Sequence, residues 1–240
     1  MAKSRAKVLR YDSVEVATVF DTEHQLLENI QSGQLDQALL LWQSSEETLV
    51  LPSGSKWQQS KSLKRSLRDI GWNLYTRKTG GAPVPQTRGV INVSYMYALP
   101  EQKEYSVSEA YEHFCDILSA FFQYYGIEVK THETPGSYCD GKYNLNINQK
   151  KVVGTAQRVV LRKGGGKVVL AQACILVDTN PEQLVSPVNL CYQNLQMPDK
   201  VVAQVHTNLF DHTASRPTVS QLFQVLFNCF VDAQKQASDQ

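Results

Sequence analysis

The chain has 240 residues, of which 42% are hydrophobic, and its formal net charge is only +1. This length and composition suit one large domain with a buried core. Neither half of the chain is strongly basic, which excludes the electrostatic signature of a nucleic-acid-binding protein.

The apolar stretches of the chain are short. None reaches the length of about 20 residues that a membrane-spanning helix needs. The first residues are not followed by the apolar run of a secretory signal peptide. We therefore expect a cytoplasmic protein that binds no membrane.

From the N-terminus, the pattern of apolar residues and turn signals predicts helices alternating with groups of strands. The first half contains an expected helix at 21–30 with Asp21 or Thr22 as its cap, a hairpin of strands 39–42 and 48–51, a helix at 60–70, and strands 72–77 and 89–97. The second half contains an expected helix at 106–125, strands 127–131, 143–147, 152–162 and 167–177, and helices 181–195 and 218–235.

The order of these elements indicates the fold class. The glycine-rich run 163–166 predicts a hairpin turn between the last two strands. Successive strands joined by short turns favour an α+β fold, with a mixed, mainly antiparallel sheet flanked by helices. We expect one catalytic domain over residues 1–240, with a core at about 39–177 and a helical C-terminal part at 178–240.

The cysteines number five and include no C-x-x-C pair. This spacing predicts neither a disulfide framework nor a tetrahedral zinc site, so we expect free thiols, no metal and no cofactor. Four cysteines lie in apolar surroundings where a small buried hydrophobic residue is the expectation: Cys115, Cys174, Cys191 and Cys229. Only Cys139 lies in a polar loop.

That loop reads Gly136-Ser137-Tyr138-Cys139, and Lys151 follows the cysteine by twelve residues, beyond a predicted strand and turn. The nucleophilic form of cysteine is the thiolate, which a nearby ammonium favours. The pair therefore predicts thiol chemistry assisted by a cation, with a partly exposed bystander cysteine as the alternative. No histidine is an evident general base.

A glycine pair follows the predicted strand 72–77, in the run Arg77-Lys78-Thr79-Gly80-Gly81. Paired glycines let backbone N–H groups approach a ligand, and an adjacent arginine is a partner for an anion. The same run also fits an ordinary tight turn between strands. On this feature alone both interpretations stay open.

A basic cluster is the exception to the neutral charge balance. It consists of Lys56, Lys61, Lys64, Arg65 and Arg68, mostly on the predicted helix 60–70. A solvated helix face and a docking surface for an acidic partner protein are both compatible with it.

Together the glycine turn and the cysteine loop resemble the lipoate-protein ligase and octanoyltransferase superfamily, which has the biotin-protein-ligase catalytic fold. The closer pattern is G-S-Y-C-x-G-x-Y-x-L-x-I followed by K-K-x-x-G-x-x-Q-R, which stands here at residues 136–147 and 150–158. It resembles the cysteine-dependent amidotransferase branch, the octanoyl-[glycine cleavage H protein]:protein N-octanoyltransferases. The resemblance runs from about residue 39 to 177.

This resemblance implies transfer of an octanoyl or lipoyl group between lysines of lipoyl-domain proteins, through a thioester on Cys139 that Lys151 assists. It implies the glycine cleavage H protein as the donor and E2 subunits of 2-oxoacid dehydrogenases as acceptors. The residues implied to contact the acyl group are Arg77, Thr79, Gly80, Gly81, Gly154, Thr155 and Ala156.

The alternatives are an ATP-dependent lipoate-protein ligase and a non-catalytic lipoyl-domain-binding protein. The family's ATP-using ligases carry a His-Asp pair where this chain has Gln86-Thr87, and an Asn where Val90 stands. These departures favour the amidotransferase over the ligase. The presence of both Cys139 and Lys151 favours an enzyme over a scaffold.

Overall fold

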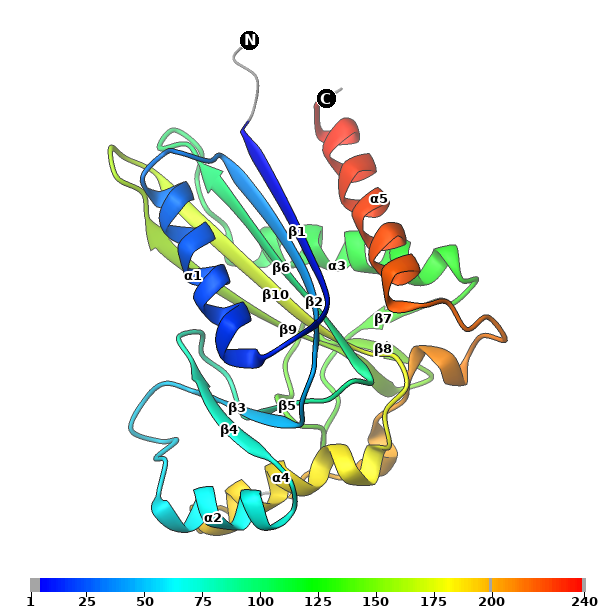
Figure 1. The fold of residues 1–240 in the computed structure, drawn as a ribbon. Helices are drawn as coiled ribbons and strands as arrows, with labels where there is room; N and C mark the ends of the chain where they lie inside the picture. The colour runs from blue at the N-terminus through cyan, green and yellow to red at the C-terminus, as the bar shows by residue number, and fades with distance from the viewer. Residues whose placement is uncertain (1–4, 199, 239–240) are drawn as a thin grey trace.

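The computed structural model describes residues 5–198 and 200–238 (Figure 1). Most of the N-terminal stretch interpreted above as lacking a signal peptide therefore lies outside the described residues. A seven-stranded sheet contains, in spatial order, β1 (Ala6–Val14), β2 (Gln37–Ser44), β6 (Val90–Leu99), β10 (Lys167–Leu176), β9 (Lys150–Leu161), β8 (Leu145–Ile147) and β7 (Lys130–Thr131). A three-stranded sheet contains β4 (Asn73–Arg77), β3 (Thr48–Pro52) and β5 (Val84–Gln86).

Helices cover both sheets. They are α1 (Val16–Gln31), α2 (Lys61–Asp69), α3 (Val107–Tyr124), α4 (Pro181–Asn194) and α5 (Val219–Ser238), with short 3₁₀ helices at Ala203–Val205 and Leu209–Asp211. Strand pairs β1–β2 and β3–β4 are parallel, and the other pairs are antiparallel. The expected α+β fold with a mainly antiparallel sheet is confirmed. Among the described residues no helix is long and apolar enough to cross a membrane.

The large sheet is buried on both faces, which explains the near-continuous apolar runs of its central strands. In β2, Leu39 and Leu41 face the core formed with α3 and α5. The alternate residues Leu40 and Trp42 face the core formed with α1, on the opposite side of the sheet (Figure 1). This alternation follows from the two-residue period of a strand.

The small sheet packs against α2 and α4, at the lower end of the molecule in Figure 1. Leu63 and Leu67 of α2 and Leu184 of α4 are buried in this layer. Tyr138, in the predicted cysteine loop, belongs to the same core cluster. The candidate site therefore lies where the small sheet meets the large one.

Several predicted elements are confirmed with shifts of a few residues at their ends, and two helix starts are well placed. The side chain of Ser60 accepts a hydrogen bond from the Leu63 backbone N–H, and Ser106 does the same for Glu109. Side-chain acceptors at these positions satisfy donors that a helix start leaves unpaired. The hairpin of β9 and β10 around residues 163–166 is also confirmed.

The expected hairpin of strands 39–42 and 48–51 is wrong. β2 pairs with β1 and β6 in the large sheet, whereas β3 pairs with β4 and β5 in the small one. The polar stretch between the two expected strands suggested a hairpin, but it carries the chain from one sheet to the other. Residues far apart in the sequence supply the partners of both strands.

Three further expectations need correction. Helix α1 begins at Val16 with Glu15 as its N-cap, so Asp21 and Thr22 lie inside the helix. The expected strand 127–131 shrinks to Lys130–Thr131, because the Ile127 N–H closes the end of α3 through a bond to the Phe122 carbonyl. The sequence pattern does not predict β1, an edge strand whose burial does not alternate strictly.

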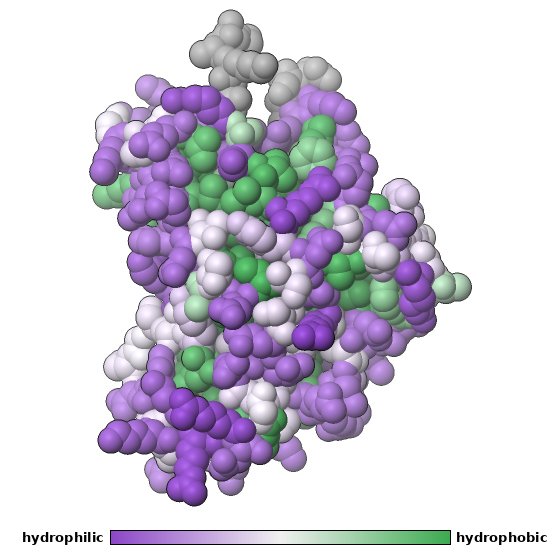
Figure 2. All heavy atoms as spheres, in the orientation of Figure 1, coloured by the Kyte–Doolittle hydropathy of each residue, from purple (hydrophilic) through white to green (hydrophobic). Residues whose placement is uncertain are grey.

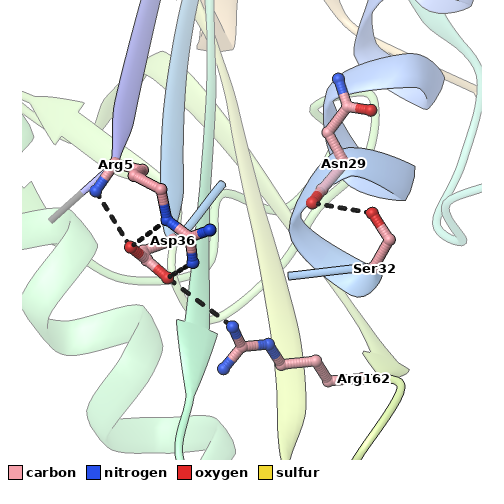
Figure 3. A network of polar contacts seen from close by, with 5 residues as sticks. All are labelled: Arg5, Asn29, Ser32, Asp36 and Arg162. Carbon is pink, nitrogen blue, oxygen red and sulfur yellow. Dashed lines mark hydrogen bonds and ion pairs between the residues drawn. The ribbon is translucent and has the colours of Figure 1, made fainter. Parts of the chain in front are cut away.

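Asp36 holds three segments together: the start of β1, the loop before β2 and the β9–β10 turn (Figure 3). Its Oδ2 accepts a hydrogen bond from the Arg5 backbone N–H at 2.9 Å, and its Oδ1 lies 3.2 Å from the Arg5 guanidinium. Arg162, in the β9–β10 turn, approaches the same oxygen at 3.6 Å. The hydrogen bond from the Arg5 backbone, followed by its side chain, lowers the pKa of Asp36.

Candidate active site

Lys151 is a fully buried cation beneath the cysteine loop. Its side chain is 0% exposed, whereas that of the adjacent Lys150 is exposed, because successive residues of β9 point to opposite faces. The Nζ of Lys151 donates to the backbone carbonyl of Tyr138 at 2.5 Å and to that of Cys139 at 3.1 Å. It also lies 4.3 Å from the centre of the Tyr138 ring. Burial lowers the pKa of Lys151 to about 8.

Cys139 occupies a sharp turn with φ of 48°, in the left-handed region that non-glycine residues seldom adopt. Such a conformation costs about 1–2 kcal/mol. The surroundings hold it in place, since the Cys139 carbonyl also accepts a hydrogen bond from Asn144 Nδ2 at 3.1 Å. The turn leaves the cysteine partly exposed while the neighbouring Tyr138 is buried.

Two glycines allow this arrangement to pack closely. A Cβ on Gly81, whose φ is 105°, would lie 3.1 Å from the Cys139 Sγ and 3.3 Å from an Arg77 nitrogen. A Cβ on Gly154 would lie 3.2 Å from the Nζ of Lys151. Both glycines therefore leave space next to Cys139 and Lys151 that a side chain would fill. The two sequence motifs meet in space at these contacts.

Arg77 is buried, and its role in this structure is to hold the glycine turn. Its guanidinium donates to the backbone carbonyls of Val50 at 3.2 Å, Gly80 at 2.9 Å and Ala82 at 3.0 Å. Through these bonds Arg77 holds the glycine turn in place. They favour the interpretation of the motif as a tight turn over the one in which Arg77 binds an anion. Burial lowers the pKa of Arg77.

A cavity opens beside Cys139 between the large sheet and the small one. Its exposed wall is mainly carbon. The expected contact residues that line it are Arg77, Gly154, Thr155 and Ala156, together with Cys139 itself. Thr79 lines a neighbouring cavity instead. Gly80 and Gly81 form the turn beside the cysteine, and Lys151 supports the loop from below.

Cys174 lines the same cavity, which corrects the expectation that it only fills the core. Its Sγ accepts a hydrogen bond at 3.3 Å from Gln86, whose amide also forms reciprocal bonds of 3.0 and 2.8 Å with Asn92. Burial raises the pKa of Cys174 to about 11, so this thiol stays protonated near neutral pH. Cys115 and Cys191 are buried as expected, and Cys229 is partly buried.

His206 and Asn144 are site residues that the sequence pattern does not reveal. The His206 ring stacks on Tyr138 with centroids 5.1 Å apart, and the backbone of His206 forms an isolated parallel β-bridge with Lys151. The adjacent Thr207 N–H donates to the Lys151 carbonyl at 2.9 Å. Burial and the Lys151 charge lower the pKa of His206 to about 4, so its ring is neutral at physiological pH.

Comparison with known proteins agrees with the geometry. The lipoyl protein ligase A/B catalytic domain family matches residues 15–231. An octanoyl-[GcvH]:protein N-octanoyltransferase of Geobacillus kaustophilus is 29% identical over 157 residues, which cover 65% of this chain and 54% of that protein. The Staphylococcus aureus protein of the same name is 35% identical over 107 residues, which cover 45% of this chain and 37% of the relative. The chain thus spans about half the length of the curated relatives it matches.

Solved structures share the fold. A lipoate-protein ligase A bound with ATP aligns over 97% of this chain and 86% of its own, with a TM-score of 0.74 and 15% identity. An archaeal bipartite lipoate protein ligase from Thermoplasma acidophilum, studied with its E2 lipoyl domain, aligns over 97% and 85%, with a TM-score of 0.69 and 14% identity. The family match extends over most of the chain. This chain therefore belongs to the lipoyl protein ligase A/B catalytic domain family.

Proposed function

We propose that this protein transfers an octanoyl or lipoyl group between lysines of lipoyl-domain proteins through a thioester on Cys139. The observation that carries the proposal is the position of Cys139. Its left-handed turn presents a partly exposed sulfur at an apolar cavity, above a buried ammonium. The curated relatives named above are octanoyl-[GcvH]:protein N-octanoyltransferases, which supports this activity.

The first step forms the acyl-enzyme. The Cys139 thiolate attacks the carbonyl carbon of the amide that joins the acyl group to the donor lysine, the C–N bond breaks, and the leaving amine takes up a proton from water. In the second step the amine of an acceptor lysine attacks the thioester, loses a proton, and the C–S bond breaks to restore the thiolate. Dividing the transfer in this way replaces one difficult displacement by two easier ones.

Lys151 prepares the loop for this chemistry. By binding the carbonyls of Tyr138 and Cys139, its ammonium fixes the strained turn and places a positive charge directly beneath it. A fixed cation in a water-poor site stabilises negative charge on sulfur and on the tetrahedral intermediate. Gly81 leaves room beside the sulfur for that intermediate.

The cavity would hold the acyl chain. Its lining includes Val84, Val93 and Ala156, and each methylene that enters gains about 0.8 kcal/mol by leaving water. Gly154 and Thr155 line the cavity, and the Thr155 N–H donates to Asn144 Oδ1 at 3.4 Å. Thr79 and Gly80 would act through the turn that they form with Gly81.

The proposed partners are lipoyl-domain proteins, with the glycine cleavage H protein as donor and E2 subunits as acceptors. The names of the curated relatives include GcvH, and one structural neighbour was studied with an E2 lipoyl domain. We propose the cytoplasm as the location, because a reducing compartment keeps Cys139 a free thiol.

We also propose that residues 1–240 act as one catalytic domain. Phe20 of α1 lines the cavity and His206 stacks on Tyr138, so segments on both sides of the 39–177 core contribute to the site. The family match over residues 15–231 supports this unit.

The competing ligase would activate a free acid with ATP. In this structure Gln86, which stands in the register of the ligase histidine, is buried and its amide is bonded to Asn92 and Cys174. These hydrogen bonds hold the Gln86 side chain in the cavity wall. This supports transfer without ATP and without a bound metal.

Mass spectrometry of the intact protein tests the proposal. Incubation with an octanoylated H protein, with EDTA and without ATP, should add one octanoyl group to Cys139, and an acceptor lipoyl domain should remove it. Cys139→Ala and Cys139→Ser should lose at least 1000-fold in transfer and keep the wild-type melting temperature, whereas Cys191→Ala should retain transfer. Full transfer by Cys139→Ala would refute the thioester, a strict requirement for ATP would favour the ligase, and binding without turnover would favour the scaffold.

A further inference from the structure

Three parallel rows of side chains lie on the face of the large sheet that borders the cavity. Strand register places one residue from each of β2, β6, β10 and β9 in every row. The first row is Trp42, Asn92, Cys174 and Gly154, the second is Leu40, Ser94, Gln172 and Ala156, and the third is Ala38, Met96, Leu170 and Arg158. Successive rows are two residues apart along each strand, which is about 6.7 Å.

The reactive cysteine lies at the first row. Gly154 of that row is next to the Nζ of Lys151, which binds the Cys139 carbonyl. The cavity continues from there to the second row, where Ser94, Gln172 and Ala156 line it. An acyl chain bound to Cys139 would therefore run along the strands, from the first row towards the third.

A wall interrupts this path after the second row. Glu23 of α1 lies over that row and accepts hydrogen bonds from Ser94 at 2.5 Å and from Gln172 at 2.7 Å. These hydrogen bonds satisfy the polar groups of Ser94 and Gln172. The surface that would contact the acyl chain is therefore mainly carbon. Phe20, one turn earlier on α1, lines the cavity beside them.

A second cavity lies on the far side of the wall. It is lined by Leu170 and Arg158 of the third row and by Tyr75 of β4. Phe20 and Arg77 line both cavities, so their side chains form the partition. Phe20 is fixed there by stacking on Tyr75 at 5.2 Å and by an edge contact with Trp42 at 5.9 Å.

We infer that Phe20 is the residue that limits the length of the acyl chain. An extended alkyl chain advances by somewhat less than its bond length of about 1.5 Å per carbon, so eight carbons span about 9–10 Å. Starting at the first row, such a chain passes the second row and ends at the wall, before the third row at about 13 Å. Longer chains need the second cavity, which the Phe20 ring separates from the first. This inference rests on the proposed function.

Small activated esters test the length limit without any carrier protein. The rate of Cys139 acylation is measured by mass spectrometry with p-nitrophenyl esters of six to twelve carbons. The wild-type rate should fall at least tenfold between the eight-carbon and the twelve-carbon ester. In Phe20→Ala, which joins the cavities, the twelve-carbon ester should react within threefold of the eight-carbon one.

Two further variants make the result specific to Phe20. Phe20→Leu keeps an apolar side chain in the core and should give a length profile between those of wild type and Phe20→Ala. It provides the test if the alanine variant folds poorly. Phe227→Ala removes a partly buried phenylalanine of α5, on the other face of the sheet, and should retain the wild-type profile.

The outcomes separate this inference from the function on which it depends. If wild type and Phe20→Leu show the same length profile, or if wild type accepts twelve carbons as readily as eight, Phe20 does not limit the chain. If no ester of any length acylates Cys139, the proposed thioester chemistry fails and the inference fails with it.

Discussion

At the scale of single residues, the contacts of Lys151 define its expected effect on Cys139. The ammonium binds the loop carbonyls, and its charge lies below the turn that carries the sulfur. Because the pKa of Lys151 is lowered to about 8, this charge is present at neutral pH and is lost as the pH rises through that value. The assistance that Lys151 gives to the thiolate should therefore disappear in mildly alkaline solution.

Lys151→Ala should slow the alkylation of Cys139 by iodoacetamide at least fivefold at pH 7 and have little effect above about pH 9. The reason is that a positive charge close to a thiol favours the thiolate. Alkylation rates measured by mass spectrometry across this pH range test the prediction. Lys150→Ala is the matched control, since Lys150 lies on the exposed face of β9. Equal effects of both substitutions would indicate that the overall positive charge near Cys139, not a specific contact, favours the thiolate. An unchanged alkylation rate in Lys151→Ala would mean that Lys151 only holds the loop.

At the scale of secondary-structure elements, α2 combines a buried apolar face with an exposed basic one. Leu63 and Leu67 pack against the small sheet, while Lys61, Lys64 and Arg65 are exposed. No salt bridge within the described part of the chain engages these cations. The lower end of the molecule in Figure 2 is accordingly strongly hydrophilic. Of the two interpretations of this cluster, the docking surface is the one that can be tested directly.

The position of α2 suits a docking role. The helix ends at Asp69, and β4 leads from there to Arg77 at the cavity, a strand of five residues spanning about 17 Å. A protein interface of about 800 Å² per partner is wide enough to include both places. An acidic carrier domain bound at α2 would thus be able to present its modified lysine to Cys139.

Replacing Lys61, Lys64 and Arg65 by Glu should reduce octanoyl transfer from an H-protein donor at least tenfold at low salt. Acylation by a small ester should remain within twofold of wild type, because the cavity is untouched. The matched control converts the exposed Lys7, Lys103 and Lys163 to Glu, an equal change in net charge outside α2. If both triple variants lose transfer equally, net charge is the cause, and if neither does, α2 is a solvated surface.

At the scale of the whole molecule, the Asp36 cluster joins the start of β1, the loop before β2 and the β9–β10 turn (Figure 3). A carboxylate whose pKa is lowered in the folded state stabilises that state at pH values above the pKa that the carboxyl has in the unfolded chain. The contribution is lost as the pH falls through the folded value. Because Asp36 and its partners are partly exposed, the contribution is modest.

Asp36→Asn should therefore lower the free energy of unfolding by up to about 1 kcal/mol at pH 7. As the pH falls through the lowered pKa of folded Asp36, the variant and wild type should converge, because the wild-type carboxyl becomes protonated. Urea unfolding at a series of pH values measures this. Asp69→Asn, which alters an exposed carboxylate of α2, serves as the control. A difference that stays constant with pH would assign the effect of Asp36 to geometry alone.

The sequence by itself determined the features that depend on near neighbours. Ser60 and Ser106 mark helix starts because a cap bonds to a backbone N–H only a few residues away. The turn at 163–166 forms a hairpin because glycines accept the positive φ values that it needs. Cys139 and Lys151 were predicted as site residues for the same reason, since one short loop and one strand contain both of them.

Only the tertiary structure decided the features that depend on distant partners. Residues 48–51 join the small sheet because β4 and β5 offer them edges there, which no local pattern encodes. Cys174 lines the cavity because strand register puts it opposite Gly154 and Asn92. His206 reaches Tyr138 from the far end of the chain. The apolar residues of the cavity floor look locally like any buried strand, and only the packing of α1 and the small sheet over them creates the space for a ligand.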